Sequence, residues 1–228
     1  MAVIHLISHF NPPDLDTARR QKVAAASWAR QPWIECPIDK LPRWFREEGR
    51  ELPYLKDLFD AGCKALQPED IIIYSNADIM VRSDCTLRIV QHMQHSDGCY
   101  GYRMDFGHRI DRPLPDSDFS KGNLYAGSDL VAFRVLWWTT YRPKMPDMIL
   151  GREATDPVLR TLVDETNPET APNEIIGIIA HERHGGAGYW EHPDNRYRLK
   201  GQMHNLTLAK KFFERRRINP ANFGIRGV

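Results

Sequence analysis

Residues 70–81, which read DIIIYSNADIMV, contain the segment that decides the fold. Ile71 to Tyr74 form a continuous apolar run, rich in β-branched side chains and bounded by turn-forming residues, which is typical of a buried strand in a parallel sheet. The run leads directly into Asn76-Ala77-Asp78. Because ligands of open α/β sheets collect at the carboxyl ends of the strands, the sequence predicts a binding site at this triplet.

Asp78 is the first candidate metal ligand. A carboxylate at a strand end can hold Mg²⁺ or Mn²⁺ against a diphosphate, since these hard cations prefer oxygen ligands and the phosphates supply several. The alternative is an Asx-turn that only closes the strand. Taken by themselves, the residues leave both interpretations open.

The rest of the chain alternates between segments of strand and helix character. Further strands are expected over residues 3–8, 33–38, 100–104, 130–133 and 174–180. Helices are expected over residues 17–29, 54–66, 86–95, 157–164 and 202–217. Long loops are expected over residues 105–121 and 181–198. This alternation predicts one α/β, Rossmann-like domain with a mostly parallel central sheet flanked by helices.

Composition narrows the function classes. A chain of 228 residues suits one domain, and its net charge of +1 provides no overall field that would favour nucleic acid or membrane partners. The N-terminus lacks the basic region of a signal peptide, and no apolar run is long enough to span a membrane. The four cysteines show no CxxC spacing. We therefore expect reduced thiols and a cytoplasmic protein.

The segment DIIIYSNADIMV resembles the DxD region of GT-A fold, nucleotide-sugar-dependent glycosyltransferases. In that family a hydrophobic strand delivers an acidic triplet to the metal and the sugar donor. Here Asn76 stands where many relatives have the first Asp, so the resemblance implies Asp78 as the metal ligand and Asn76 as a ribose or metal contact. It implies a single domain over residues 1–228. Its parts would be a nucleotide-binding half (1–100), an acceptor and catalytic half (101–205), and a basic C-terminal helix and tail (206–228).

The same resemblance implies a set of donor-binding residues. VIHLISHFNPP resembles the first strand and loop of the family, which hold the nucleobase and ribose, and LPYLKDLFDAGCKALQPED resembles the helix before the DxD strand. Arg20 could reach the diphosphate, or it could lie on a solvated helix face. The implied donor-binding residues are Ser8, His9, Phe10, Arg20, Asp57, Asn76, Ala77, Asp78, Gly127 and Ser128.

Two further segments supply candidate catalytic carboxylates. NLYAGSDLVAFR resembles the segment that lines the donor sugar and acceptor, and Asp129 in it would hydrogen-bond sugar hydroxyls or pair with Arg134. ILGREATDPVLRTL resembles the segment that carries the acceptor-side acidic residue of inverting members. Asp156 is the candidate base, with Glu153 second. The sequence around Asp156 also fits an ordinary helix N-terminus.

The late segment IIGIIAHERHGGAGYW resembles the place from which GT-A enzymes take a further metal ligand, frequently His. His181 and His184 would join Asp78 there around a divalent metal, Mn²⁺ or Mg²⁺, or would contact phosphate or acceptor. Either histidine could also be structural. His204 and Asn205, in a segment resembling a closing helix of related proteins, could also reach the site.

These observations favour metal-assisted transfer of a sugar to a hydroxyl acceptor. The donor is by default a UDP-sugar, and the acceptor is a saccharide or a modified nucleic acid. No membrane partner is expected. Basic residues in the tail and at Arg103, Arg109 and Arg112 in the predicted loop would suit an acceptor of hydroxylated bases in DNA, as in small phage DNA-base glucosyltransferase-like proteins. A non-catalytic nucleotide- or carbohydrate-binding module is the main alternative. A nucleotidyltransferase is disfavoured by the lack of glycines after the first strand, and an HxxH hydrolase by the lack of HExxH.

Overall fold

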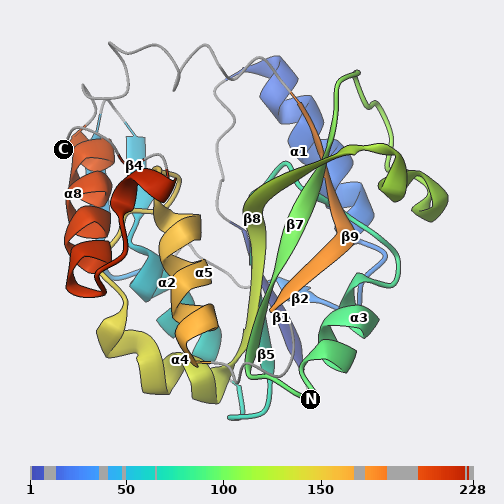
Figure 1. Ribbon diagram of the computed structural model, residues 1–228. Coiled ribbons are helices and arrows are strands. Elements are labelled where there is room, and N and C mark those ends of the chain that lie inside the picture. The colour runs from blue at the N-terminus through green and yellow to red at the C-terminus, as the bar shows by residue number, and fades with distance from the viewer. Residues whose placement is uncertain are drawn as a thin grey trace.

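The computed structural model describes residues 2–7, 14–35, 41–47, 50–64, 66–166, 173–183, 200–223 and 225. Within them the chain forms a twisted central sheet with helices on both faces, which confirms the predicted α/β class (Figure 1). No helix in these ranges combines the length and apolarity needed to cross a bilayer.

The central sheet of the described chain has the strand order β2-β1-β5-β8-β7-β9-β6. Its strands are β1 (Val3–Ile7), β2 (Ile34–Glu35), β5 (Ile71–Ser75), β6 (Met80–Val81), β7 (Gly98–Phe106), β8 (Asn123–Arg134) and β9 (Glu174–Glu182). The predicted strand after Asp70 is therefore present as β5, and it is buried along its whole length.

The sheet is mixed, whereas the sequence predicted a mostly parallel one. Strands β2, β1 and β5 run parallel, but β8 is antiparallel to both of its neighbours, β5 and β7. Strand β7 then pairs in parallel with β9, which pairs antiparallel with β6. A continuous apolar strand is buried equally well in either direction, so hydrophobicity alone could not give the strand directions.

Helices cover the two faces of the sheet unequally. Figure 1 shows α1 and α3 on one side of the sheet and α2, α4, α5 and α8 on the other. Their bounds are α1 (Leu15–Trp28), α2 (Leu55–Cys63), α3 (Cys85–His92), α4 (Val135–Tyr141), α5 (Thr155–Thr166) and α8 (Lys200–Arg215). Short 3₁₀ segments occur at Asp116–Lys121, Arg142–Lys144 and Pro220–Phe223. A small antiparallel hairpin, β3 (Trp44–Glu47) and β4 (Arg50–Pro53), stands apart from the main sheet.

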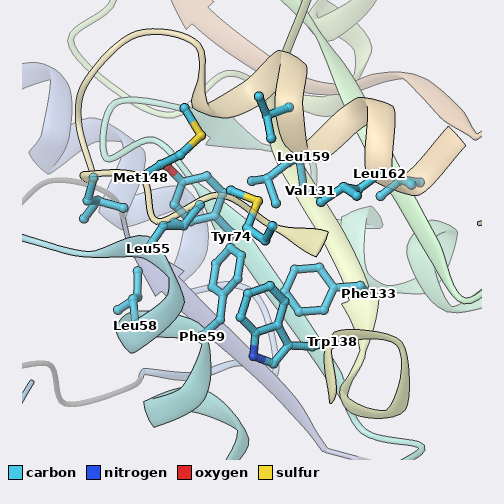
Figure 2. Packing of buried hydrophobic residues seen from close by; sticks show 14 of the residues in the cluster. Leu55, Leu58, Phe59, Tyr74, Val131, Phe133, Trp138, Met148, Leu159 and Leu162 are labelled. Atoms are coloured by element: carbon cyan, nitrogen blue, oxygen red, sulfur yellow. The ribbon is translucent and has the colours of Figure 1, made fainter. Parts of the chain in front are cut away.

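Alternate side chains of β5 enter two separate hydrophobic cores. Ile71 and Ile73 pack toward α1 and α3, whereas Ile72 and Tyr74 pack toward α2, α4, α5 and α8. In the second core the ring of Phe59 meets Tyr74, whose ring centroid lies 5.5 Å away, and the rings of Phe133 and Trp138 (Figure 2). Burial on both faces fixes β5 at the centre of the molecule, and its carboxyl end is fixed with it.

Strand β7 has irregular pairing with both neighbours at the level of Arg103. On one side Gly101 pairs with Leu130 and Arg103 with Tyr125, so Tyr102 alone lies opposite residues 126–129 of β8. On the other side consecutive residues of β7, Tyr102 and Arg103, pair with Ile176 and Ile179 of β9. Such bulges re-aim side chains and are common beside functional sites.

Candidate active site

The topology singles out one end of the sheet. From β1 the chain passes through α1 to β2 on one side of β1, and β5 pairs with β1 on the other side. The strand order therefore reverses between β1 and β5, and ligands of α/β sheets bind outside the carboxyl ends of strands at such a point. Asn76, Ala77 and Asp78 follow β5 at this position. Ser8, His9 and Phe10, which follow β1, lie outside the described residues.

Asn76 is joined to Asp129 by two hydrogen bonds. Its backbone N–H donates to the Asp129 carbonyl oxygen at 3.2 Å, and its side-chain Nδ2 donates to Asp129 Oδ1 at 2.6 Å. Asp129 belongs to the stretch of β8 that leaves the regular ladder with β7. The irregular pairing thus places a β8 carboxylate beside the end of β5.

Arg103 joins Asp129 to a second carboxylate. Its Nη1 lies 3.1 Å from Asp129 Oδ2, and its Nε lies 2.8 Å from Asp105 Oδ1. The Nε contact is an ion pair without the alignment of a hydrogen bond. Burial acts to lower the pKa of Arg103, but the charges of Asp129 and Asp105 outweigh burial and raise it.

His181 extends the same chain of contacts to Asp78. Its Nδ1 lies 3.2 Å from Asp105 Oδ1 and its Nε2 lies 3.5 Å from Asp78 Oδ2. Burial acts to lower the pKa of His181, but the two carboxylates overcome burial and raise the pKa to about 9. Side chains from β7, β8, β9 and the segment after β5 therefore form one continuous network, defined here as the strand-end network: Asp78, His181, Asp105, Arg103, Asp129 and Asn76.

His181 lies in β9, opposite Asp105, and not in a loop as the sequence predicted. The buried strand runs two residues farther than its apolar run, to Glu182. His184, the second predicted histidine, lies outside the described residues.

The contact between Asp78 and His181 suits a shared divalent cation. Ligand atoms at about 2.0–2.2 Å from one ion lie roughly 3–3.5 Å from each other, and the observed separation is 3.5 Å. Asp105 holds the other ring nitrogen of His181, as carboxylates commonly do behind metal-bound histidines. The described ranges contain no group of three or more His, Cys, Asp or Glu residues placed for a metal. An ion here would therefore take its remaining ligands from phosphate oxygens and water.

Asp156 lies in the first turn of α5, as predicted, and its side chain is half-buried. Burial and the negative charge of Asp129 raise the pKa of Asp156 to about 8, although Arg103 acts in the opposite direction. The hydroxyl of Ser128 donates to the Asp156 carbonyl oxygen at 3.5 Å. Asp156 is therefore electrostatically coupled to the strand-end network and can take up a proton near neutral pH.

Two predicted donor-binding side chains have partners outside this network. Arg20 is buried, pairs with Asp16, and donates to Thr17 Oγ1 at 2.9 Å, so it does not lie on a solvated helix face. Asp57 accepts two hydrogen bonds of 2.8 Å from Arg43. The contacts of Arg20 lie within α1, whereas Asp57 ties α2 to the segment before β3.

The remaining small residues of the predicted donor site are partly or fully buried. Ala77 is 4% exposed and Ser128 is 3% exposed. At Gly127 a Cβ would lie 2.5 Å from Cε1 of Tyr125 and 3.0 Å from Asp129 Oδ2, so only glycine fits between these side chains. The lack of a side chain at Gly127 is thus a packing requirement of the site itself.

The helix α8 residues have structural contacts. His204 Nε2 lies 2.8 Å from the Asp147 carbonyl oxygen. Asn205 is buried and exchanges two hydrogen bonds of 2.8 Å with the backbone of Ile149. The Glu153 backbone N–H donates to Gln202 at 3.0 Å. These contacts fasten α8 to the segment that precedes α5.

Sequence reasoning missed Arg103 and Asp105 as site residues because it ended the predicted strand at residue 104, assigned Asp105 to the loop that follows, and treated Arg103 only as part of a basic patch. Both lie in β7, which continues to Phe106. A signal was available, since YGYRMDF places Arg103 and Asp105 two residues apart and hence on one face of a strand. Likewise Asp129 pairs with Arg103 and not with Arg134, which contacts Asp97 instead.

Comparisons with known proteins give a limited likeness. No protein-family model and no curated protein sequence matches the chain. Among solved structures, residues 1–349 of S. aureus TarS in complex with UDP-GlcNAc match with a TM-score of 0.49 and 11% sequence identity, covering 97% of this chain and 74% of that one. A second crystal structure of S. aureus TarS residues 1–349 matches with a TM-score of 0.47 and 10% identity, with the same coverage. A likeness this distant carries no functional argument, which must come from the site.

Proposed function

We propose that the protein is a GT-A type glycosyltransferase that moves a sugar from a nucleoside diphosphate sugar to a hydroxyl acceptor. The strand-end network is the observation that carries this proposal. It lies at the carboxyl ends of β5, β7 and β9, and it combines a pair suited to a cation, Asp78 and His181, with further carboxyl groups.

Asp78 and His181 would hold a divalent cation, Mn²⁺ or Mg²⁺, against the donor diphosphate. When bound, such a cation neutralises negative charge on the departing nucleoside diphosphate. Asp105 fixes the ring of His181, and Arg103 fixes Asp105 through their 2.8 Å contact. These two residues position the cation ligands and do not touch substrate.

Asp156 would act as the general base. Its carboxylate takes the proton of the acceptor hydroxyl while that oxygen forms a bond to the anomeric carbon of the donor sugar. The bond between this carbon and the diphosphate oxygen breaks, and the nucleoside diphosphate leaves with the electron pair. Burial, together with the charge of Asp129, holds the pKa of Asp156 near 8, in the range in which a carboxylate is an effective base at neutral pH. A single displacement of this kind inverts the anomeric configuration.

One property of the site, the raised pKa of Asp156, favours this proposal over a non-catalytic binding module. A module that only binds a nucleotide sugar has no use for a carboxyl group whose pKa lies far above its ordinary value, because the shift destabilises the charged form. The raised pKa of Asp156 is therefore better explained by proton transfer than by ligand binding alone.

A thermal-shift panel of nucleotide sugars, with UDP-glucose and UDP-GlcNAc among them, tests donor and cation together. We expect at least one donor to raise the melting temperature only when Mn²⁺ is present, because a ligand that binds only the folded state stabilises it by mass action. Asp78→Asn should abolish this shift. The matched control is Asp111→Asn, which makes the same change at an exposed carboxylate and should keep the shift.

The panel can also refute the proposal. If no nucleotide sugar shifts the wild-type protein with or without Mn²⁺, the protein is not a nucleotide-sugar enzyme. If a donor shifts both wild type and Asp78→Asn equally without Mn²⁺, donor binding survives but the role of the cation fails.

A further inference from the structure

The pre-α5 turn, residues 149–154, has a backbone conformation that its own sequence does not favour. The Val158 backbone N–H donates to the Ala154 carbonyl oxygen at 3.4 Å, so Ala154 is the N-cap of α5. An N-cap is usually Ser, Thr, Asp or Asn with an extended backbone. Ala154 has no capping side chain, and its φ of 70° lies in the left-handed region, which is unfavourable for a residue with a Cβ. Contacts from elsewhere in the fold therefore impose this conformation.

Two fully buried amide side chains of α8 supply such contacts. Asn205 Nδ2 donates to the Ile149 carbonyl oxygen at 2.8 Å, and Asn205 Oδ1 accepts from the Ile149 N–H at 2.8 Å. The same Nδ2 lies 3.4 and 3.3 Å from the carbonyl oxygens of Arg152 and Glu153. Gln202 Oε1 accepts from the Glu153 N–H at 3.0 Å. The backbone is thus held from the start of the turn up to the residue before the strained alanine.

The pre-α5 turn leads directly to the Asp156 carboxyl group. Asp156 lies in the first turn of α5, where the Ser128 hydroxyl donates to its carbonyl oxygen at 3.5 Å. Burial, together with the charge of Asp129, raises the pKa of this carboxyl group to about 8, whereas the charge of Arg103 lowers it. Backbone strain of this kind persists at functional sites when the surrounding structure fixes it. A turn that relaxed at Ala154 would reorient the start of α5 and let water reach the carboxyl group.

We propose that Gln202 and Asn205 are positioning residues for Asp156. They hold the pre-α5 turn in its strained conformation, and this turn keeps the Asp156 carboxyl group buried beside Asp129. Both amides bind backbone atoms and do not touch substrate. The inference rests on the proposed function only in that it calls Asp156 the base. The sequence suggested that Asn205 reaches the site directly, whereas here it acts through the backbone before α5.

Titration of Asp156 by carbon NMR spectroscopy of aspartate-labelled protein tests this inference without any substrate. The signal is assigned by its absence from Asp156→Asn. The test variant is Gln202→Met, which removes one hydrogen bond to the turn. It should not prevent folding, because Gln202 Nε2 has no hydrogen-bond partner among the described residues and methionine is an unbranched side chain of similar size. We expect the pKa of Asp156 to fall by about 1 or more as the carboxyl group gains water.

Ala154→Gly should partly reverse the effect of Gln202→Met. Glycine adopts positive φ about as readily as negative φ, so the turn has less tendency to relax when a hydrogen bond is lost. In the double variant the pKa of Asp156 should return at least halfway to its wild-type value. The matched control is Arg217→Gly, because Arg217 is the other non-glycine residue with positive φ in the described part of the chain and follows α8. It should restore nothing.

Gln31→Met controls for the loss of buried hydrogen bonds in general. Gln31 is buried and bonds the backbone of Arg82 and Ser83 and the side chain of Thr86, on the side of the sheet that carries α1 and α3 (Figure 1). Because more hydrogen bonds are lost, this variant should lower the melting temperature at least as much as Gln202→Met. It should leave the titration of Asp156 unchanged.

The outcomes separate this inference from the proposed function. An unchanged titration of Asp156 in Gln202→Met overturns the inference, as does an equal change in Gln31→Met or an ordinary pKa of Asp156 in the wild type. If the titration moves as expected but no nucleotide sugar stabilises the protein, the positioning role stands and the transferase falls. If a donor is turned over, Gln202→Met should lower kcat about tenfold and leave the donor KM within about twofold, because the base moves and the cation ligands do not.

Discussion

At the scale of a single residue, the Asp129 carboxylate takes part in three interactions. It accepts a hydrogen bond from Asn76 at 2.6 Å, forms an ion pair with Arg103 at 3.1 Å, and raises the pKa of Asp156 by its charge. The first two contacts occupy both oxygens of the Asp129 carboxylate. Asp156, whose pKa is raised to about 8 by burial and by the charge of Asp129, is the carboxyl group that can exchange a proton, so the two groups have different chemical roles.

This division of roles predicts a pH dependence. A base with a pKa of about 8 is mostly protonated at neutral pH, so kcat/KM for donor turnover should rise with pH up to about 8. Asp129→Asn removes the like charge and leaves Arg103 without one of its partners. Both changes lower the pKa of Asp156, so the acidic limb of the profile should move to lower pH. Release of nucleoside diphosphate, followed across the pH range, measures the shift.

Asp97→Asn is the control for the pH experiment, because Asp97 is an exposed carboxylate that pairs with Arg134. It should leave the acidic limb where it is in the wild type. An acidic limb that stays unchanged in Asp129→Asn would show that Asp156 does not limit the reaction as the base.

At the scale of the elements, the sequence predicted most of the helices and strands. It predicted less well which strands pair with each other and in which direction. The continuous apolar run of β5 and the amphipathic pattern of α2 are local signals, and both elements are present. Helix α4 was missed because Trp137 and Trp138 are bulky residues of modest helix propensity that owe their place to packing in the core. The β3–β4 hairpin was missed because its short strands lack a continuous apolar run.

In the candidate site, too, individual residues were predicted from the sequence but their contacts with each other were not. Asp78 and Asp156 were predicted because each follows or begins a recognisable element. The contact between Arg103 and Asp129 was not, because it depends on a bulge that places one residue of β7 opposite four of β8. Register shifts of this kind are set by tertiary packing and leave little trace in the local sequence.

Gly177 should be required for the second irregularity, the one between β7 and β9. Its φ of +73° lies in the left-handed region, and nothing lies within 4 Å of a Cβ placed there, so strain alone decides the effect of a substitution. Gly177→Ala should cost about 1–2 kcal/mol. For a chain of this size that lowers the melting temperature by roughly 2–8 °C, which differential scanning fluorimetry measures.

Gly107→Ala is matched to this variant in all but backbone conformation. A Cβ at Gly107 also meets nothing within 4 Å, but its φ is not in the left-handed region. It should be close to neutral. Equal melting temperatures for the two variants would mean that the β9 bulge does not depend on the glycine conformation.

At the scale of the whole molecule, a buried ion pair joins segments that are far apart in the sequence. Arg152, just before α5, donates to Glu47 Oε2 of β3 at 2.9 and 2.5 Å. The other oxygen of Glu47 accepts from the backbone N–H of Gly201 in α8 at 2.7 Å. Both side chains are 4% exposed. The hairpin, α8 and the start of α5, which carries Asp156, thus meet at one carboxylate.

Replacing one partner of this ion pair should lower the free energy of unfolding strongly, whereas replacing both partners should lower it little. Glu47→Gln leaves a buried guanidinium without its counter-charge and should destabilise the fold by about 3–5 kcal/mol, while Glu47→Gln/Arg152→Met should recover most of that loss. Urea unfolding followed by tryptophan fluorescence measures both. The exposed pair Arg46–Glu51 on the same hairpin, at 2.8 Å, is the internal comparison, and Glu51→Gln should cost less than about 1 kcal/mol. If Glu47→Gln cost no more than Glu51→Gln, the carboxylate would not be what holds these three segments together.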